Sequence, residues 1–295
     1  MTTAAQDIER VGARTRSSRL LGFLSKGPTH VILVLLAIFW LTPSIGLLVT
    51  SFRPAEEISQ SGWWSVFTEP AQLTFDSYSS LLSDDSLVQA LLSTFYITIP
   101  TTLLVVLIAA LAGYAFAWID FKGRDLVFLL VIALIVVPLQ MALIPMARLF
   151  GDLGVFGTVW AAVFFHVAFG LPFAIFLLRN FFIGLPGELF EAARIDGASE
   201  WQIFTRIVLP LGMPAIAALA IFQFLWTWND LLVGLVFTGG ENIPITVFIR
   251  DQLRQFGGNL DIIAPGAFIS MVVPLIVFFA FQRYFVQGLL AGSVK

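Results

Sequence analysis

Two long apolar runs of this chain are joined by the segment PGELFEAARIDGASEWQIFTRIVLP, residues 186–210. We expect a short helix to begin after Pro186, because proline fits the first turn of a helix and Glu188 there complements the helix dipole. Asp196-Gly197 is expected to end that helix, since glycine readily adopts the left-handed conformation of a helix terminus.

A second short helix is predicted directly after this turn. Ser199 is followed three residues later by Gln202, which matches the capping box at the start of a helix. Leu209-Pro210 is expected to break the helix, because the residue before a proline disfavours the α-helical conformation. The segment therefore predicts a helix-turn-helix between two apolar runs.

The surface of this helix-turn-helix supports two interpretations. Its large apolar side chains, Leu189, Phe190, Trp201 and Phe204, are interspersed with polar residues, which suits a helix that lies on lipid headgroups. The small residues Ala192 and Ala193 equally suit docking into a groove of another protein. The physical pattern alone leaves both interpretations open.

Outward from this segment, the charged residues divide the chain into six uncharged runs of at least 21 residues each, whereas about 20 apolar residues cross a bilayer core. We predict an all-α polytopic membrane protein with a permease domain at 27–290 and short tails at 1–26 and 291–295. The predicted spans are approximately 30–51, 91–118, 126–147, 154–178, 210–236 and 264–284, and the segment 186–210 is a loop between the fourth and the fifth.

Composition supports this class. Of the 295 residues, 58% are hydrophobic and 12% are charged, and the mean hydropathy is +0.92. A soluble domain carries about 25% charged residues. The absence of cysteine excludes disulfides and thiol chemistry, and the two histidines are too far apart in sequence for a local metal motif. We therefore predict no metal or cofactor bound by this chain and no nucleic-acid partner.

The distribution of basic residues predicts the orientation. One side of the predicted membrane holds twelve lysines and arginines, including those of residues 1–26 and of the segment 186–210, and the other side holds only Arg53, Arg148, Arg250 and Arg254. Because basic residues are enriched in cytoplasmic loops, both termini are expected to be cytoplasmic.

The quoted segment resembles a known family. Glu191-Ala-Ala-x-x-x-Gly197 with Ile207-x-Leu209-Pro210 is similar to the "EAA" loop of permease subunits in binding-protein-dependent ABC importers. The form Glu-Ala-Ala-x-x-Asp-Gly-Ala resembles the sugar-transporting branch. Trp226-Thr-Trp-Asn-Asp230 and the C-terminal stretch from Phe285 to Lys295 resemble the smaller permease of the maltose-type systems.

The resemblance implies a type I ABC importer permease fold in a prokaryotic cytoplasmic (inner) membrane. It implies four kinds of partner besides membrane lipid: a second homologous permease, two cytoplasmic ATPase subunits that use ATP and Mg, an extracytoplasmic sugar-binding protein, and a sugar or oligosaccharide, with a glucoside as the first candidate. Transport would proceed by alternating access, and the C-terminal tail would reach toward the ATPase dimer. The residues that couple the permease to the ATPase would be Glu191, Ala192, Ala193, Asp196, Gly197, Leu209 and Pro210.

Candidates for the substrate path lie near the end of the fifth span. Asp230 is the only acid between residues 207 and 239, and an ionisable residue at membrane depth is a candidate functional residue. Aromatic faces and hydrogen-bonding groups together suit a sugar, but an interfacial anchor, a gating role or a bond to the partner permease would use the same residues. The candidates are Trp226, Trp228, Asn229 and Asp230, with Gln223 and Gln140 as further polar residues.

Other functions fit the sequence less well. His166 has no acid in its own span, and we expect it to bond to a backbone carbonyl. The chain lacks the Gly-x-x-x-x-Gly-Lys-Ser/Thr loop that binds phosphate, so ATP hydrolysis is assigned to a partner, and this chain is predicted not to be an enzyme. An ion-coupled secondary transporter is the alternative, and a membrane-embedded enzyme, which needs clustered polar residues, is the remote one.

Overall fold

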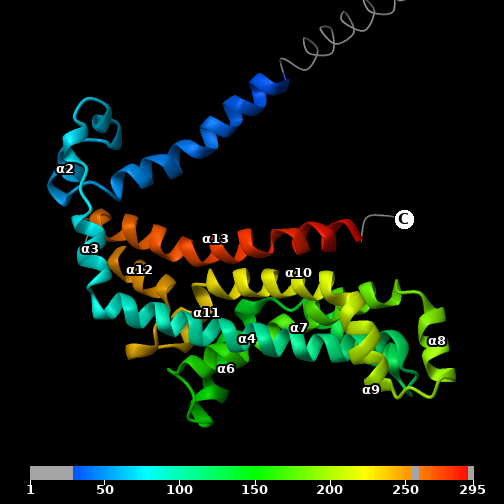
Figure 1. Cartoon of the computed structure of the whole chain (residues 1–295). Coiled ribbons are helices and arrows are strands. Elements are labelled where there is room, and N and C mark those ends of the chain that lie inside the picture. The colour runs from blue at the N-terminus through cyan, green and yellow to red at the C-terminus, as the bar shows by residue number, and fades with distance from the viewer. Residues whose placement is uncertain (1–28, 254–258, 292–295) are drawn as a thin grey trace, which may run out of the picture.

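The computed structural model describes residues 29–253 and 259–291, and every named element within these ranges is helical (Figure 1). The all-α prediction is confirmed. Of the predicted tails, residues 1–26 and all but the first residue of 291–295 lie outside the described residues. Most of the C-terminal stretch from Phe285 to Lys295 is a helical backbone that continues to Ala291.

Four long helices run alongside one another and form the body of the molecule (Figure 1). They are α4 (Asp85–Trp118), α7 (Val159–Ile183), α10 (Leu209–Trp228) and α13 (Leu260–Ala291). The most extensive contact is between α4 and α7. Small residues allow it, since a Cβ added to Gly113 of α4 would lie only 3.0 Å from the backbone nitrogen of Arg179 in α7. Close approach of backbones at small residues is typical of helices packed within membranes.

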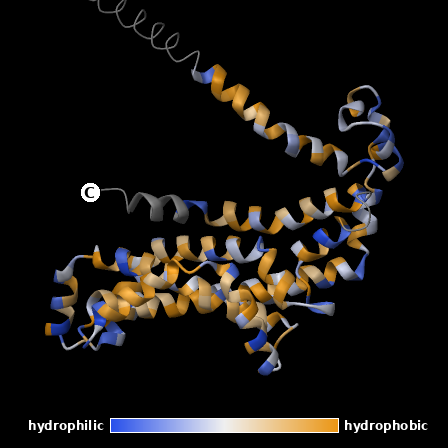
Figure 2. Ribbon diagram, turned by 180° about the vertical axis from the view of Figure 1, so that it is seen from behind, coloured by the Kyte–Doolittle hydropathy of each residue, from blue (hydrophilic) through white to orange (hydrophobic). Residues whose placement is uncertain are grey.

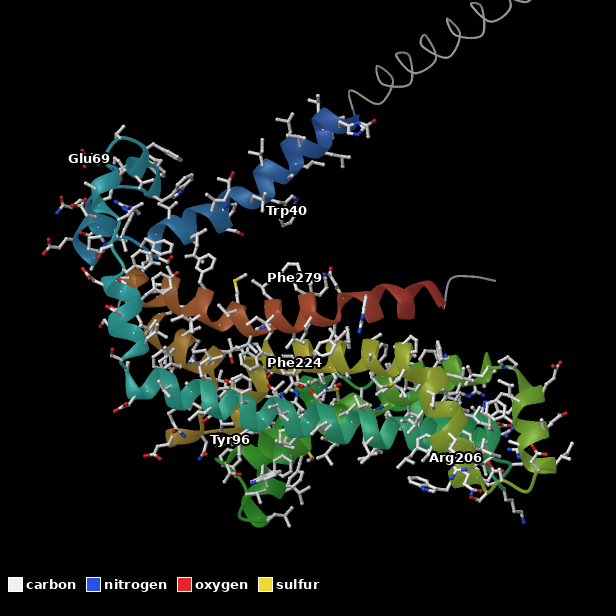
Figure 3. The ribbon with its side chains drawn as sticks, in the orientation of Figure 1. Trp40, Glu69, Tyr96, Arg206, Phe224 and Phe279 are labelled. Atoms are coloured by element: carbon white, nitrogen blue, oxygen red, sulfur yellow. The ribbon has the colours of Figure 1, made fainter. Side chains whose placement is uncertain are left out.

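The first described helix, Thr29–Thr50, has a different environment. It leaves the four-helix body at an angle, and only 6% of its apolar window is buried. Trp40 on this helix is 75% exposed and stands clear of the rest of the chain (Figure 3). The helix is long and apolar enough to cross a membrane, and its exposed side chains suit lipid or another membrane helix.

Five helices of the described chain have the length and hydropathy of membrane spans, and one bent pair would make a sixth. The predicted span at 126–147 is not one continuous helix but the bent pair. There, α5 (Arg124–Ile135) and α6 (Leu139–Asp152) meet at 100°. Pro138 explains the break, because it disfavours a helical residue before it and lacks the N–H that would continue the helix.

The predicted span 210–236 is also interrupted. Helix α10 ends at Trp228, and the short helix α11 (Leu232–Phe237) follows after the break. The other spans shift at their ends only: the helices cover 85–118, 159–183 and 260–291 where the sequence predicted 91–118, 154–178 and 264–284. Helix ends at a membrane surface are set by polar contacts that hydropathy does not register.

The long segment between the first two spans folds around one arginine. It contains α2 (Ala55–Gln60), two 3₁₀ turns, η1 (Trp63–Phe67) and η2 (Pro70–Gln72), and α3 (Asp76–Leu82). Arg53 is 1% exposed. Its guanidinium donates to Gln72 Oε1 at 2.7 Å, to Ser61 Oγ at 2.6 Å and to the carbonyl of Glu57 at 2.8 Å. A buried charge is tolerated here because several acceptors satisfy it.

The two ends of the four-helix body differ in structure. Helices α8 (Gly187–Ile195) and α9 (Glu200–Ile203) form one end. At the opposite end lie α2, α3 and α12 (Ile245–Leu253), which follows the turn η4 (Gly240–Asn242). Figure 2 shows hydrophobic residues along the long helices and hydrophilic residues gathered at these ends. This distribution is the one expected of a protein that spans a bilayer.

Candidate coupling loop and buried polar site

Helix α8 ends as the sequence predicts. Its last turn is closed at Asp196, and Gly197 adopts the left-handed conformation with φ of +80°. The amide of Ala198 donates to the carbonyl of Ala193 at 3.0 Å and so satisfies a carbonyl at the helix end. We call the segment from Gly187 to Ile203, which holds α8 and α9, the coupling loop.

The capping box of α9 is confirmed. The amide of Ser199 donates to Gln202 Oε1 at 2.8 Å, and the amide of Gln202 donates to Ser199 Oγ at 3.3 Å. The predicted break at Leu209-Pro210 is wrong. Instead, a π-helical turn, η3 (Phe204–Val208), continues directly into α10. The wider π turn accommodates the missing N–H of Pro210, because its carbonyls are already displaced from the regular α-helical ladder.

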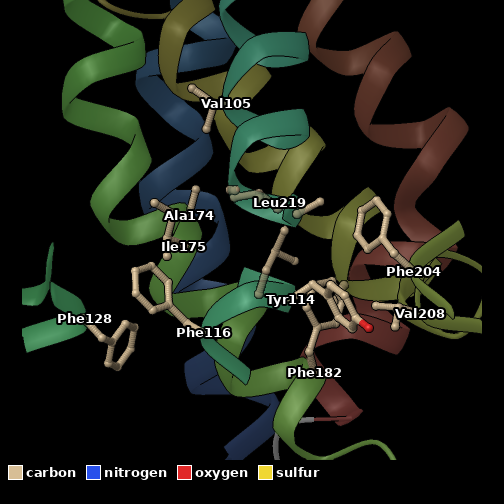
Figure 4. Packing of buried hydrophobic residues seen from close by; sticks show 14 of the residues in the cluster. Val105, Tyr114, Phe116, Phe128, Ala174, Ile175, Phe182, Phe204, Val208 and Leu219 are labelled. Carbon is tan, nitrogen blue, oxygen red and sulfur yellow. The ribbon is translucent and has the colours of Figure 1, made fainter. Parts of the chain in front are cut away.

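The underside of the coupling loop belongs to the core of the bundle. Phe190 is fully buried and stacks on Trp118 at the end of α4, with ring centroids 4.2 Å apart. The indole nitrogen of Trp118 donates to the carbonyl of Phe182 at 2.7 Å. Figure 4 shows Phe182, Phe204 and Val208 gathered around Tyr114 in the same cluster. These contacts fix the loop against α4 and α7.

The outer face of the loop is open. Glu191 and Ala192 are exposed, Ala193 is half-buried, and Asp196 and Gly197 are exposed. Ile195, at the tip of α8, is 86% exposed. A hollow of about 330 Å³ lies beside the turn, with polar lining from Asp196, Gln202 and Arg206. A small, solvated surface with an apolar tip is suited to docking with another protein.

Leu209 and Pro210 have a different setting from the other predicted coupling residues. Leu209 is half-buried and packs against the cluster beneath the loop, and Pro210 is exposed on the first turn of α10. The structure therefore separates the seven predicted coupling residues into an exposed group on α8 and its turn and a pair at the start of α10.

A second polar site lies near the far end of α10. Asp230 follows the helix, and its Oδ2 accepts a 2.7 Å hydrogen bond from the amide of Val233, so the carboxylate caps α11. The backbone carbonyl of Asp230 accepts from Thr246 Oγ1 at 2.7 Å. Oδ2 also lies 3.7 Å from Nε2 of His166, which projects from α7.

The contact with Asp230 corrects the expectation for His166. We expected a bond to a backbone carbonyl, whereas this side chain, 1% exposed, faces the carboxylate. Its Nδ1 is buried without a hydrogen-bond partner, and its ring meets that of Trp226 edge-on at 5.2 Å. Sequence reasoning missed the pairing because the two residues lie on different helices and no local motif joins them.

Threonines complete the polar site. A narrow cavity is lined by His166, Asp230, Thr94, Thr98 and Thr227. Thr94 Oγ1 accepts a 2.8 Å hydrogen bond from the amide of Ile245. Buried hydroxyls of this kind join helices inside a membrane bundle. The site therefore ties α4 and α7 to the α10–α11 break and to the start of α12.

The remaining substrate-path candidates are dispersed. Trp228 is fully buried, stacks on Phe224 and donates from its indole nitrogen to the carbonyl of Ser270 at 3.0 Å, so it joins α10 to α13. Gln223 is buried and donates to Thr227 Oγ1 at 3.1 Å.

Two further candidates lie apart from this site. Asn229 is exposed, and its side chain donates to the carbonyl of Leu225 at 2.8 Å, which caps α10. Gln140 is exposed on α6. Of the six candidates, only Trp226 and Asp230 meet at His166, and Gln223 is linked to that site through Thr227.

The fold and the loop define a class: a polytopic membrane subunit whose spans surround buried polar residues and whose exposed loop suits a partner protein. The family comparison agrees. A model of the family "binding-protein-dependent transport system inner membrane component" matches residues 105–290. The chain belongs to this family, and the resemblance stated from its motifs is confirmed.

Two curated relatives are similar over much of the chain. The osmoprotective compounds uptake permease protein GgtD of Synechocystis sp. is 45% identical, over 100% of both chains. The alpha-glucoside transport system permease protein AglG of Rhizobium meliloti is 49% identical over 77% of this chain and 62% of its own length.

A solved structure shares the fold. A chain of a bacterial ABC transporter involved in the import of the acidic polysaccharide alginate superposes with a TM-score of 0.73 and 23% identity, covering 92% of this chain and 98% of that one. The predicted importer permease fold is confirmed. The chain is a multi-pass inner-membrane component of a transport system.

Proposed function

We propose that this chain is the permease subunit of an ATP-driven importer that brings a small sugar, with α-glucosides as the first candidates, into the cell by alternating access. The observation that carries this proposal is the coupling loop: an exposed helix α8 whose underside is packed into the bundle at Phe190 and whose Ile195 side chain is free for a partner. Family membership supplies the kind of partner.

The proposed assembly contains two ATPase subunits, a second permease and an extracytoplasmic sugar-binding protein. Neighbouring solved structures include an alginate ABC transporter in complex with an alginate pentasaccharide-bound periplasmic protein. By analogy, the end of the bundle with α2, α3 and α12 would receive the binding protein, and the end with α8 would face the cytoplasm. Residues 1–26 and 291–295 would then both be cytoplasmic. Closure of the ATPase dimer would rotate the bundles and switch the side to which the cavity opens.

The relatives and the chemistry of the site support the proposed substrate class. One similar permease is named for alpha-glucosides and another for osmoprotective compounds. Trp226 and Asp230 combine an aromatic ring with a carboxylate, a combination that binds sugars through ring faces and hydroxyls. Because Asp230 also caps α11, we assign it a gating role, with sugar contact as the second possibility.

The test is reconstitution. An affinity tag on this chain is used to purify the assembled transporter, which is placed in liposomes with its binding protein and MgATP. ATP hydrolysis is then measured with trehalose, sucrose and maltose, and with an amino acid as the non-sugar control. The proposal expects stimulation by at least one glucoside and uptake only with ATP. Uptake driven by a proton or sodium gradient without ATP would support the secondary-transporter alternative instead.

A further inference from the structure

A hydrogen-bonded triad joins the coupling loop to the end of α4. Tyr114, which is 4% exposed, donates its hydroxyl to Oε2 of Glu200. Arg194 donates to the same carboxylate, from Nε to Oε1 at 3.0 Å and from Nη2 to Oε2 at 3.4 Å. Nη2 also donates to the carbonyl of Trp118 at 3.3 Å. One carboxylate is thus held by a helix of the bundle and by the last turn of α8.

The three residues come from three different elements. Tyr114 is on α4, Arg194 is in the last turn of α8, and Glu200 begins α9. The glutamate is favoured at that position by the dipole of α9, and its hydrogen bond with Arg194 raises the pKa of the guanidinium. The triad fixes both the angle between α8 and α9 and the position of the pair on α4.

The stabilisation that the ion pair between Arg194 and Glu200 provides is too small to explain this arrangement. Arg194 and Glu200 have side chains that are 39% and 45% exposed, and ion pairs with such exposure contribute about 0–1 kcal/mol. The two N–H···O bonds of an arginine on a carboxylate do, however, fix the orientation of the two side chains relative to each other. Tyr114 adds a buried hydroxyl that donates to Glu200. This hydrogen bond restrains the position of the loop relative to α4.

The connection on the other side of the loop is built differently. From α9 the chain enters α10 through the π-helical turn Phe204–Val208, and prolines follow at Pro210 and Pro214. A π turn and prolines both weaken the regular hydrogen-bond ladder of a helix. The loop is therefore linked to α4 by directed bonds and to α10 by a segment whose helical hydrogen bonds are less regular.

We infer that Tyr114, Arg194 and Glu200 are positioning residues that make the coupling loop and α4 move as one body, while the π-helical turn absorbs the movement relative to α10. The inference rests on the proposed function of the loop. Movement of α4 would carry α7, because these two helices share the most extensive contact in the bundle. A movement of α8 would then be transmitted through α4 to α7, which carries His166 of the buried polar site.

The first experiment removes one hydroxyl. Tyr114→Phe keeps the ring and its contact with Phe204, whose centroid is 5.4 Å away, and deletes the bond to Glu200. Tyr78→Phe is the matched control, because its hydroxyl bonds to Ser51 Oγ at 2.8 Å at the opposite end of the bundle. Glu200→Gln is the second variant. It allows the inference to be tested even if Tyr114→Phe expresses poorly.

Each variant is purified as the assembled transporter and reconstituted with its binding protein and a glucoside that stimulates the wild type. We expect Tyr114→Phe and Glu200→Gln to retain the ATPase subunits and to lower sugar transported per ATP by about fivefold, the factor that one lost hydrogen bond represents. The double variant should lose less than the product of the two single losses, because both changes act on the same carboxylate. Tyr78→Phe should leave the ratio unchanged.

A lowered melting temperature with an unchanged ratio of transport to ATP hydrolysis in both variants would overturn the inference, since it would make the triad merely structural. Absence of an ATPase from the wild-type complex would overturn the proposed function itself and the inference with it. The two failures are therefore distinguishable from one preparation.

A second experiment measures movement directly. The chain contains no cysteine, so spin labels can be placed at introduced cysteines without background from this subunit. The pair Leu111→Cys and Ile195→Cys reports on α4 and α8, and the pair Ile195→Cys and Met213→Cys reports on α8 and α10; all three side chains are exposed. Between nucleotide-free and ATP-bound transporter, the first distance should stay constant and the second should change. The reverse result would overturn the inference.

Discussion

The coupling loop and the polar site at His166 and Asp230 are two polar regions built in opposite ways. The loop lies at one end of the bundle, has an exposed outer face and is shaped by residues that are close in sequence, such as Ser199 and Gln202. The polar site is buried, and its members come from separate helices. The first is the proposed surface for a partner, and the second joins helices to one another.

Because the two regions are built differently, substitutions in them should have different effects on the molecule. On the outer face of the loop, a change would alter the proposed contact with a partner, and the bundle can remain folded. At the polar site, a change alters packing of α4, α7 and the α10–α11 break together, because the side chains that line the cavity come from all of these elements. Each prediction below sets a loop residue or a polar-site residue against a matched position.

The largest effect is expected from Gly197→Val. Gly197 has φ of +80°, and an added Cβ would meet nothing within 4 Å, so the cost arises from the backbone conformation alone. A β-branched residue disfavours that conformation, and the turn after α8 should shift. We expect transport to be abolished while the permease still assembles in the membrane. Uptake assays and size-exclusion chromatography measure the two properties.

Gly154→Val is the matched control, because Gly154 also has a positive φ, +70°, and open space around it, but lies between α6 and α7. It should tolerate valine with transport largely retained. Normal transport by the Gly197 variant would show that the turn has no part in coupling.

The next largest effect is expected from Phe190→Ala, which removes the loop's anchor on Trp118. Deleting a buried phenylalanine side chain costs about 3–5 kcal/mol, and the loop should detach from the bundle as a consequence. Thermal unfolding in detergent should show a clear fall in the midpoint. Phe67→Ala, at a side chain that is 76% exposed, should leave the midpoint almost unchanged. Equal midpoints for the two variants would mean that the loop is not part of the core.

At the polar site, Asp230→Ala is expected to have an intermediate effect. It removes the cap of α11, which costs about 0.5–2 kcal/mol, and it also removes the carboxylate beside His166. Asp84→Ala removes only a cap, since Asp84 accepts from the amide of Ser86 at 2.8 Å at the exposed start of α4. The midpoint should therefore fall further for Asp230→Ala. A fall no larger than that of Asp84→Ala would show that the contact with His166 contributes nothing to stability.

The loop was largely predictable from sequence because its determinants are local. Asp196-Gly197 and the Ser199–Gln202 box specify the turn and the second helix within a few residues. The prediction failed at Leu209-Pro210, where a π turn continues the helix. That outcome depends on Phe204 and Val208 being buried against α4 and α7, which is tertiary information.

The polar site was predictable only in part. Asp230 stands out as an isolated acid in an apolar stretch, but nothing in the sequence pairs it with His166, which is 64 residues away along the chain. Trp228, although part of the same motif, faces α13. The size of the bend at Pro138 was not predicted, because hydropathy records whether a segment can enter a membrane and not at what angle its two halves meet.

The smallest effect on stability is expected from Ile195→Ser. Ile195 is 86% exposed, and surface substitutions usually change stability by less than about 0.5 kcal/mol, so the unfolding midpoint should not move. If the outer face of α8 is the contact with an ATPase, loss of an exposed apolar side chain should nevertheless reduce the amount of ATPase that copurifies with the permease. Phe67→Ser is the control, because it removes an exposed apolar side chain at the other end of the bundle. Equal ATPase recovery in both variants would show that Ile195 is not part of the docking surface. A lowered unfolding midpoint for Ile195→Ser would show that the exposed face of the loop also contributes to the stability of the bundle.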